Sequence, residues 1–280
     1  MDSHHNRKPA GRGVTIVEVF IIVLAILVLA LFALVLLNSR HRQRMAGAVR
    51  DAAQIRGIQQ SWTIFAREFG GEMPTPSMMI RLTADGIETT QRGSEDVTLN
   101  TTANLHSVAI MQNYYTSEMC VSPTEPNPKV KALAGDDYNY NVYKPAASTY
   151  WDSTFTANMQ TGSNVSYASM PIHGQLRAKH WKQTASATWP IIGNRGPING
   201  VHDPNSFTLR IHPPFDQWSG NICFADSHFE FVTGLPTGTT AGGSTMNTQG
   251  LFRYDGEEDS DGILTFTKSM SRDGPVIQHD

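Results

Sequence analysis

The sequence is short of the residues and motifs on which many enzymes and metal sites depend. It has two cysteines in 280 residues, and it contains no His-Glu-x-x-His, Gly-x-Ser-x-Gly or Cys-x-x-Cys motif. Charged residues make up only 17% of the chain and the formal net charge is −3, so the basic surface that nucleic-acid binding needs is missing. We therefore expect neither enzyme activity nor a nucleic-acid partner.

Two cysteines limit the chain to one internal disulfide bond. Cys120 and Cys223 would form it only in an oxidising compartment, and Cys223 lies between Ile222 and Phe224 in an expected strand. A bridge between the two cysteines and a pair of free buried thiols are both open alternatives.

One long apolar run is present. The 19 residues from Val19 to Leu37 carry no polar side chain, and no proline interrupts the segment from Val14 to Asn38. At about 1.5 Å per residue the run covers roughly 30 Å of hydrocarbon, which predicts a membrane-spanning helix over residues 14–37. Glu18 lies one turn inside this segment, where an unpaired charge costs about 3 kcal/mol, so we expect it to have a partner.

The spacing around Glu18 suggests that partner. A cut between Gly13 and Val14 would create a new amino group four residues before Glu18, and on a helix these two groups lie on one face. Glu18 can pair with the amine of its own chain or with that of a neighbouring copy. In the second case its burial is satisfied only in an assembly.

The segment from Arg12 to Glu18 (Arg-Gly-Val-Thr-Ile-Val-Glu), followed by the apolar run, resembles the prepilin signal of type IV pilins and type II secretion pseudopilins. The resemblance implies that a prepilin peptidase removes a leader of residues 1–13 and that the Val14 amine is N-methylated. It also implies that copies of this chain or other pilins stack through residues 14–37, with Glu18 as the register contact. Val14 stands where the family usually has Phe, and the proline common midway along the family's helix is absent.

Two other kinds of N-terminal segment fit less well. A secretory signal peptide has a shorter apolar core and a small-x-small cleavage site, which Leu36 to Arg40 does not offer. A plain signal anchor explains the span but neither Gly13 nor Glu18. Basic residues flank both ends of the span, so charge alone gives no orientation. The resemblance implies a single pass through the lipid of the inner membrane, with a cytoplasmic N-terminus and a domain in the periplasm or on the cell surface.

Residues 38–70 are expected to continue the helix with one apolar stripe that packs on a sheet. The stripe consists of Ile55, Ile58, Trp62, Phe65 and Phe69. The less favoured alternative is that this stripe is a surface for a partner protein. The opposite, polar face is expected to hold Arg50, Asp51, Gln54, Gln60 and Arg67. Gly70-Gly71, followed by Pro74 and Pro76, ends the helix.

Residues 71–280 are expected to form one exported domain of helices, strands and long loops. We expect a helix over Leu105 to Tyr115 and a strand over Tyr138 to Tyr143. A loop-rich insertion from Lys144 to Gln183 is expected to contain a strand near Val165 to Ala168. Ile222 to Val232 predicts two strands joined at a turn in which Asp226 accepts backbone N–H bonds.

The helix end from Ile55 to Pro74, the Cys120 segment and the Asp226 hairpin are similar to pilin-like proteins of planctomycetes and verrucomicrobia. Ser227 replaces a glycine of those relatives, and His212 lies further before Asp226 than is usual for them. The implied fold is α+β and pilin-like. It has a long N-terminal helix packed on a C-terminal antiparallel sheet, with loop insertions.

Two groups of residues are candidate sites. Asp226, His228 and His212 offer a metal or catalytic site only if a further ligand or a nucleophile joins them, and a structural turn is the favoured interpretation. The second group has carboxylates at alternate positions, as a weak calcium loop would, but it lacks the glycine after the third acid and the distal Glu that an EF-hand-like loop would have. The residues of this second group are Asp255, Glu257, Asp259 and Asp261. The alternative is that they form a solvated acidic turn that binds no metal.

These patterns favour a structural role. We expect a pilin or pseudopilin subunit that prepilin peptidase processes and that assembles into a type IV pilus-like or type II secretion filament. The alternative is a membrane-anchored binding module that never polymerises and holds a ligand with the loops from Lys144 to Gln183. An anchored hydrolase that uses Asp226 and His228 is a third, weaker hypothesis.

Overall fold

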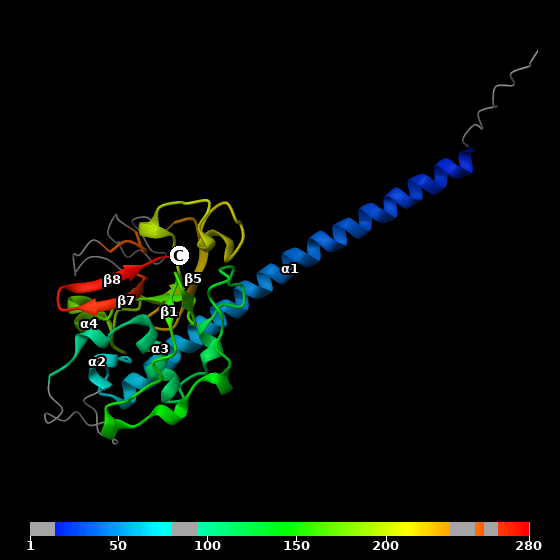
Figure 1. Cartoon of the computed structure of the whole chain (residues 1–280). Coiled ribbons are helices and arrows are strands. Elements are labelled where there is room, and N and C mark those ends of the chain that lie inside the picture. The colour runs from blue at the N-terminus through cyan, green and yellow to red at the C-terminus, as the bar shows by residue number, and fades with distance from the viewer. Residues whose placement is uncertain (1–14, 80–93, 236–249, 255–262, 280) are drawn as a thin grey trace, which may run out of the picture. The chain divides into compact units, whose positions relative to one another are not determined.

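The computed structural model describes residues 15–79, 94–235, 250–254 and 263–279 (Figure 1). The chain divides into an N-terminal unit, residues 1–45, and a C-terminal unit, residues 46–280. Helix α1 (Ile16–Glu68) begins in the first unit and ends in the second. The two units are described separately below.

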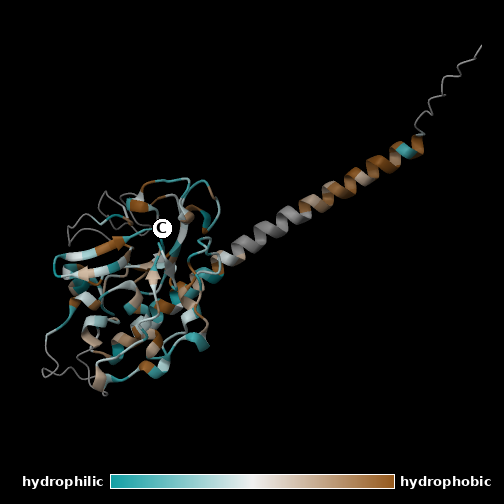
Figure 2. Ribbon diagram, in the orientation of Figure 1, coloured by the Kyte–Doolittle hydropathy of each residue, from teal (hydrophilic) through white to brown (hydrophobic). Residues whose placement is uncertain are grey.

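The N-terminal unit contains the apolar part of α1. Ile16–Leu34 has a mean hydropathy of 3.2 and is, by length and composition, long and apolar enough to cross a membrane. Figure 2 shows the hydrophobic colouring along this part of the helix. The large apolar side chains of Ile16–Leu34 are exposed in this unit.

The C-terminal unit combines helices with antiparallel sheets, which agrees with an α+β fold. Its main sheet has four strands in the order β3-β4-β5-β6. They are β3 (Tyr167–Ser169), β4 (Pro190–Asn194), β5 (Ser219–Phe224) and β6 (Phe229–Thr233). Two strand pairs accompany this sheet, β1 (Ala157–Asn158) with β2 (Gly162–Ser163) and β7 (Phe266–Ser271) with β8 (Gly274–Gln278).

Short helices lie before the first strand and between later strands. The α-helices are α2 (Pro76–Met79), α3 (Thr102–Met111) and α4 (Gly174–His180). The 3-10 helices in the described residues are η2 (Val97–Leu99), η3 (Ser117–Cys120), η4 (Gly135–Asp137), η5 (Tyr140–Val142), η6 (Pro145–Ala147), η7 (Ile198–Gly200) and η8 (Phe207–Arg210).

The apolar stripe on the later part of α1 lies in the core, as predicted. Ile55, Ile58 and Trp62 are fully buried, and Phe65 is 2% exposed. Two polar side chains attach the same helix face to the sheet region. Gln59 Nε2 donates to the Ala225 carbonyl at 2.9 Å, and Asn221 Nδ2 donates to the Ala48 carbonyl at 3.1 Å. The stripe is therefore core rather than a partner surface.

The helix ends where the glycine pair predicted. The last helical residue is Glu68, and Gly70 and Gly71 take the left-handed φ values of 74° and 94°. The Gly71 N–H then donates to the Ala66 carbonyl at 2.6 Å, which satisfies one of the carbonyls left open at a helix end.

Two local predictions shift and one is wrong. The expected helix at Leu105 to Tyr115 is α3, which starts earlier, capped by Thr101, and ends earlier, at Met111. The strand expected near Val165 is β3, two residues later.

The strand predicted over Tyr138 to Tyr143 is wrong, because Tyr140–Val142 within this segment forms the 3-10 helix η5. The Asn139 side chain accepts the Asn141 N–H at 3.1 Å, a local bond that favours a turn over extended pairing.

Candidate functional site

Glu18 has a partner within its own chain. Its carboxylate accepts the Thr15 backbone N–H at 2.8 Å and the Thr15 hydroxyl at 3.0 Å, while the Glu18 N–H donates to Thr15 Oγ1 at 3.3 Å. This reciprocal pair is a capping box at the start of α1. The spacing Thr-x-x-Glu at residues 15–18 is a sequence signal for it. Gly13 and Val14 lie outside the described residues.

The Asp226 hairpin is present as predicted. Strands β5 and β6 meet at a turn in which Asp226 Oδ1 accepts the His228 N–H at 3.0 Å and also contacts His228 Nδ1. Burial alone would raise the pKa of Asp226, but these bonds with His228 outweigh it and lower the pKa. Ser227 takes a φ of 70° where a glycine would be unstrained. Its hydroxyl donates to Gln59 Oε1 on α1, which ties the turn to the helix.

His212 does not join Asp226 and His228. It is fully buried and its Nε2 lies 3.0 Å from Asp51 Oδ2, whereas the side chains of His228 and Asp226 are 41% and 46% exposed. No group of three or more His, Cys, Asp or Glu side chains suited to a metal ion occurs among the described residues. Of the three residues, the hairpin therefore brings together only Asp226 and His228.

Asp51 is the residue that the sequence pattern misplaced. It was expected on the exposed face of the helix, but its side chain is 0% exposed. Its carboxylate accepts the Tyr167 hydroxyl at 3.0 Å and Asn221 Nδ2 at 2.9 Å, in addition to the contact with His212. Burial alone would raise the pKa of Asp51, but the hydrogen bond and charge of His212 outweigh it and hold that pKa below its ordinary value. This network links α1, β3 and β5.

Both cysteines are buried, free thiols in the structure. Burial raises the pKa of Cys120 well above its ordinary value and raises that of Cys223 to about 12. Cys120 Sγ lies 3.5 Å from His106 Nδ1. Burial also lowers the pKa of His106 to about 3, so the imidazole is neutral and does not activate the thiol. The four acidic residues proposed as a calcium loop lie outside the described residues, from 255 to 262.

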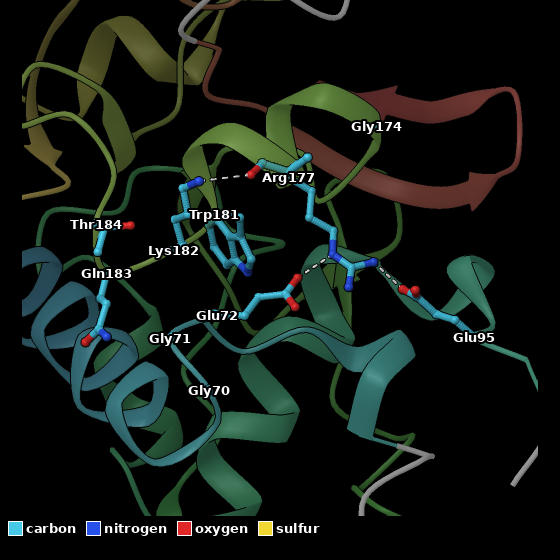
Figure 3. Close-up of a pocket in the computed structure, with 11 residues that line it drawn as sticks. Gly70, Gly71, Glu72, Glu95, Gly174, Arg177, Trp181, Lys182, Gln183 and Thr184 are labelled. Atoms are coloured by element: carbon cyan, nitrogen blue, oxygen red, sulfur yellow. Dashed lines mark hydrogen bonds and ion pairs between the residues drawn. The ribbon is translucent and has the colours of Figure 1, made fainter. Parts of the chain in front are cut away.

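A hollow in the described part of the C-terminal unit lies between the end of α1 and helix α4 (Figure 3). Its volume is about 670 Å³. The lining comes from three parts of the chain, Gly70 to Glu72, Glu95, and the run from Gly174 to Thr184. The lining residues are Gly70, Gly71, Glu72, Glu95, Gly174, Arg177, Ala178, Trp181, Lys182, Gln183 and Thr184.

One side of the hollow is a triad of Glu72, Arg177 and Glu95. Arg177 Nε bonds Glu72 Oε1, and Arg177 Nη1 bonds Glu95 Oε1. Burial would lower the pKa of Arg177, but the two carboxylates outweigh burial and raise it, so the guanidinium stays charged. Trp181, another residue that lines the hollow, is fully buried, and its Nε1 donates to the Pro74 carbonyl at 3.1 Å. The hollow therefore has charged walls in a fixed geometry.

Sequence reasoning did not find this hollow, although parts of its lining were visible. From the sequence, the Gly70-Gly71 pair indicates only the end of the helix, and the loops from Lys144 to Gln183 suggest a ligand site without specifying its residues. No family model matches this chain, no curated protein matches it, and no solved structure matches it.

Proposed function

We propose that this chain is a structural pilin or pseudopilin subunit, anchored by α1 and released from its leader by a prepilin peptidase. The observation that carries the proposal is the segment from Arg12 to Glu18 directly before an apolar helix of spanning length. A single carboxylate at the start of such a helix is expensive in lipid. The new amine of a processed neighbour would offset that cost.

The architecture of the C-terminal unit supports the same proposal. The amphipathic end of α1 packs on an antiparallel sheet, as the resemblance to pilins implies. In the proposed arrangement the helix crosses the inner membrane once, with the domain in the periplasm or on the cell surface. The subunit's partners would be other copies or related pilins, through residues 14–37. No catalytic step is part of the proposal.

The first test is the intact mass and N-terminal residue of the protein recovered from membranes of its native host. We expect a start at Val14, with one added methyl group on its amine. A protein that starts at Met1 would contradict the proposal, because Glu18 would then have no new amine to meet.

The second test distinguishes two roles of Glu18: the cap that it forms with Thr15 at the start of α1, and the proposed contact that sets the register between neighbouring subunits. Glu18→Gln keeps an oxygen that accepts the Thr15 bonds but removes the charge, whereas Glu18→Ala removes both. We expect both variants to reach the membrane and neither to enter filaments sheared from the cells. Normal assembly of Glu18→Gln would show that Glu18 serves only as a helix cap, and would overturn its register role.

One observation favours a second candidate, the anchored binding module. Most of the hollow's lining, from Gly174 to Gln183, lies in the loop-rich insertion assigned to ligand binding in that alternative. A module of this kind would be indifferent to Glu18→Ala, so the assembly test distinguishes the two functions.

A further inference from the structure

The hollow between α1 and α4 has the size and shape of a small-molecule site. Its volume of about 670 Å³ lies within the range of about 300–1,000 Å³ typical of ligand pockets. Two of its lining residues, Gln183 and Thr184, are exposed, so the hollow is open to solvent.

Among the described residues that line the hollow, the formal charges cancel. Arg177 and Lys182 supply two cations, and Glu72 and Glu95 supply two anions. A site that selects a phosphate or a carboxylate would present an excess of positive charge, and a site for an amine would present an excess of negative charge. This balance favours a ligand without net charge.

The polar groups of the hollow both donate and accept hydrogen bonds from fixed positions. The triad uses one oxygen of each carboxylate, and among the described residues Oε2 of Glu72 and Oε2 of Glu95 accept no hydrogen bond. Across the hollow, the Gln183 backbone N–H donates to the Gly71 carbonyl at 3.0 Å, which holds that residue in place. The Gln183 amide and the Thr184 hydroxyl add further donors and acceptors.

The glycines let a ligand approach the backbone closely. Gly70 and Gly71 have left-handed φ values and no side chain between the end of α1 and the hollow. A Cβ on Gly71 would lie 3.5 Å from Gln183 Nε2, within the space that a ligand would share with that amide. Planar polar groups around a glycine-lined surface suit a molecule that carries many hydroxyl groups.

We propose that this hollow binds a neutral saccharide. Sugar hydroxyls both donate and accept, so a carboxylate oxygen and an amide can each engage adjacent hydroxyls. The inference goes beyond the proposed subunit role and does not depend on assembly. A protein that assembles but binds no saccharide would overturn this inference alone, and one that binds but does not assemble would overturn only the subunit proposal.

The test is calorimetric titration of the full chain in detergent with four neutral probes: glucose, galactose, mannose and N-acetylglucosamine. Nα-acetyl-lysine amide, whose side-chain amine is positively charged, and inorganic phosphate are the charged probes. We expect at least one sugar to bind with a Kd below about 10 mM. The Kd should change less than about twofold between about 0.05 and 0.5 M NaCl, because screening acts on charges.

Two variants locate the site. Gln183→Ala and Thr184→Val change exposed side chains and should each weaken sugar binding up to about tenfold, through the loss of a hydrogen bond. Gln217→Ala, an exposed glutamine outside the hollow, is the matched control and should not change the Kd. The proposal is overturned if no sugar binds, if only a charged probe binds, or if both hollow variants bind sugar as the unaltered protein does.

Discussion

At the scale of single residues, Asp51 stabilises the domain because three donors replace the water that its carboxylate has lost. An ionised side chain in the interior is tolerated only with such partners. Tyr167, Asn221 and His212 come from segments more than 110 residues further along the chain. A helical pattern reads only neighbours three and four residues apart, so it placed Asp51 on the polar face and could not predict these partners.

Asp51→Asn should destabilise the protein by about 3 kcal/mol, because an amide in this position turns a donor towards donors and removes the buried carboxylate that His212 Nε2 contacts. Urea unfolding of the full chain in detergent would measure the change. Asp216→Asn, at an exposed site, is the control, with an expected effect below about 0.5 kcal/mol. Equal stability of the two variants would contradict the role given to Asp51.

The same network makes stability depend on pH. The pKa of Asp51 is lower in the folded than in the unfolded state, so the unfolded chain binds more protons in the window between the two values. The stabilisation is complete above the ordinary aspartate pKa of 3.8 and is lost as the pH falls below it. The difference between the unaltered protein and Asp51→Asn should therefore shrink in unfolding measured below about pH 4.

At the scale of elements, the end of α1 gives a clean test of backbone conformation. Gly70 has a φ of 74° and open space around the position of a Cβ. Gly70→Ala should therefore cost about 1 kcal/mol through conformation alone. Gly162 also has open space but is not left-handed, so Gly162→Ala should stay within about 0.5 kcal/mol. Thermal unfolding of both variants checks this, and equal effects would contradict the explanation.

The elements that sequence predicted well are those whose signal is local. In the stripe from Ile55 to Phe65, apolar residues recur every three or four positions. In the two strands on either side of Asp226, apolar residues alternate with other residues, and Asp226 itself is a typical turn residue. Tyr138 to Tyr143 also alternates, but there the Asn139 side chain accepts the backbone N–H of Asn141. The Tyr138 hydroxyl donates to the Ser107 carbonyl at 2.8 Å. The alternation of polar and aromatic residues does not show that such local hydrogen bonds compete with strand pairing.

The candidate sites also differ in whether their residues lie close together in the sequence. Thr15 and Glu18 are three residues apart, so their capping box follows from the sequence pattern. The hollow unites Glu72, Glu95 and Arg177, whose contacts span up to 105 residues. Such a triad depends on how α4 folds back against the end of α1, and no local pattern contains that information.

At the scale of the whole molecule, the two thiols report whether the chain folds without a covalent link. Both are buried, and burial raises the pKa of each, so neither should react with N-ethylmaleimide at neutral pH in the folded protein. In denaturant without reductant we expect two additions by intact mass. A protein that adds none under these conditions would instead contain the Cys120–Cys223 bridge.

The bond between Asp51 and His212 also sets an order of events during synthesis. The two residues are 161 positions apart, so α1 can coil long before the groups that cover its inner face exist. At a typical rate of about 5–20 residues per second, the gap lasts roughly 10–30 s. During that time Ile55, Ile58 and Trp62 have no sheet to lie on. A nascent chain that already holds its first helix in a bilayer would need a chaperone to shield those three side chains until the second half of the domain arrives.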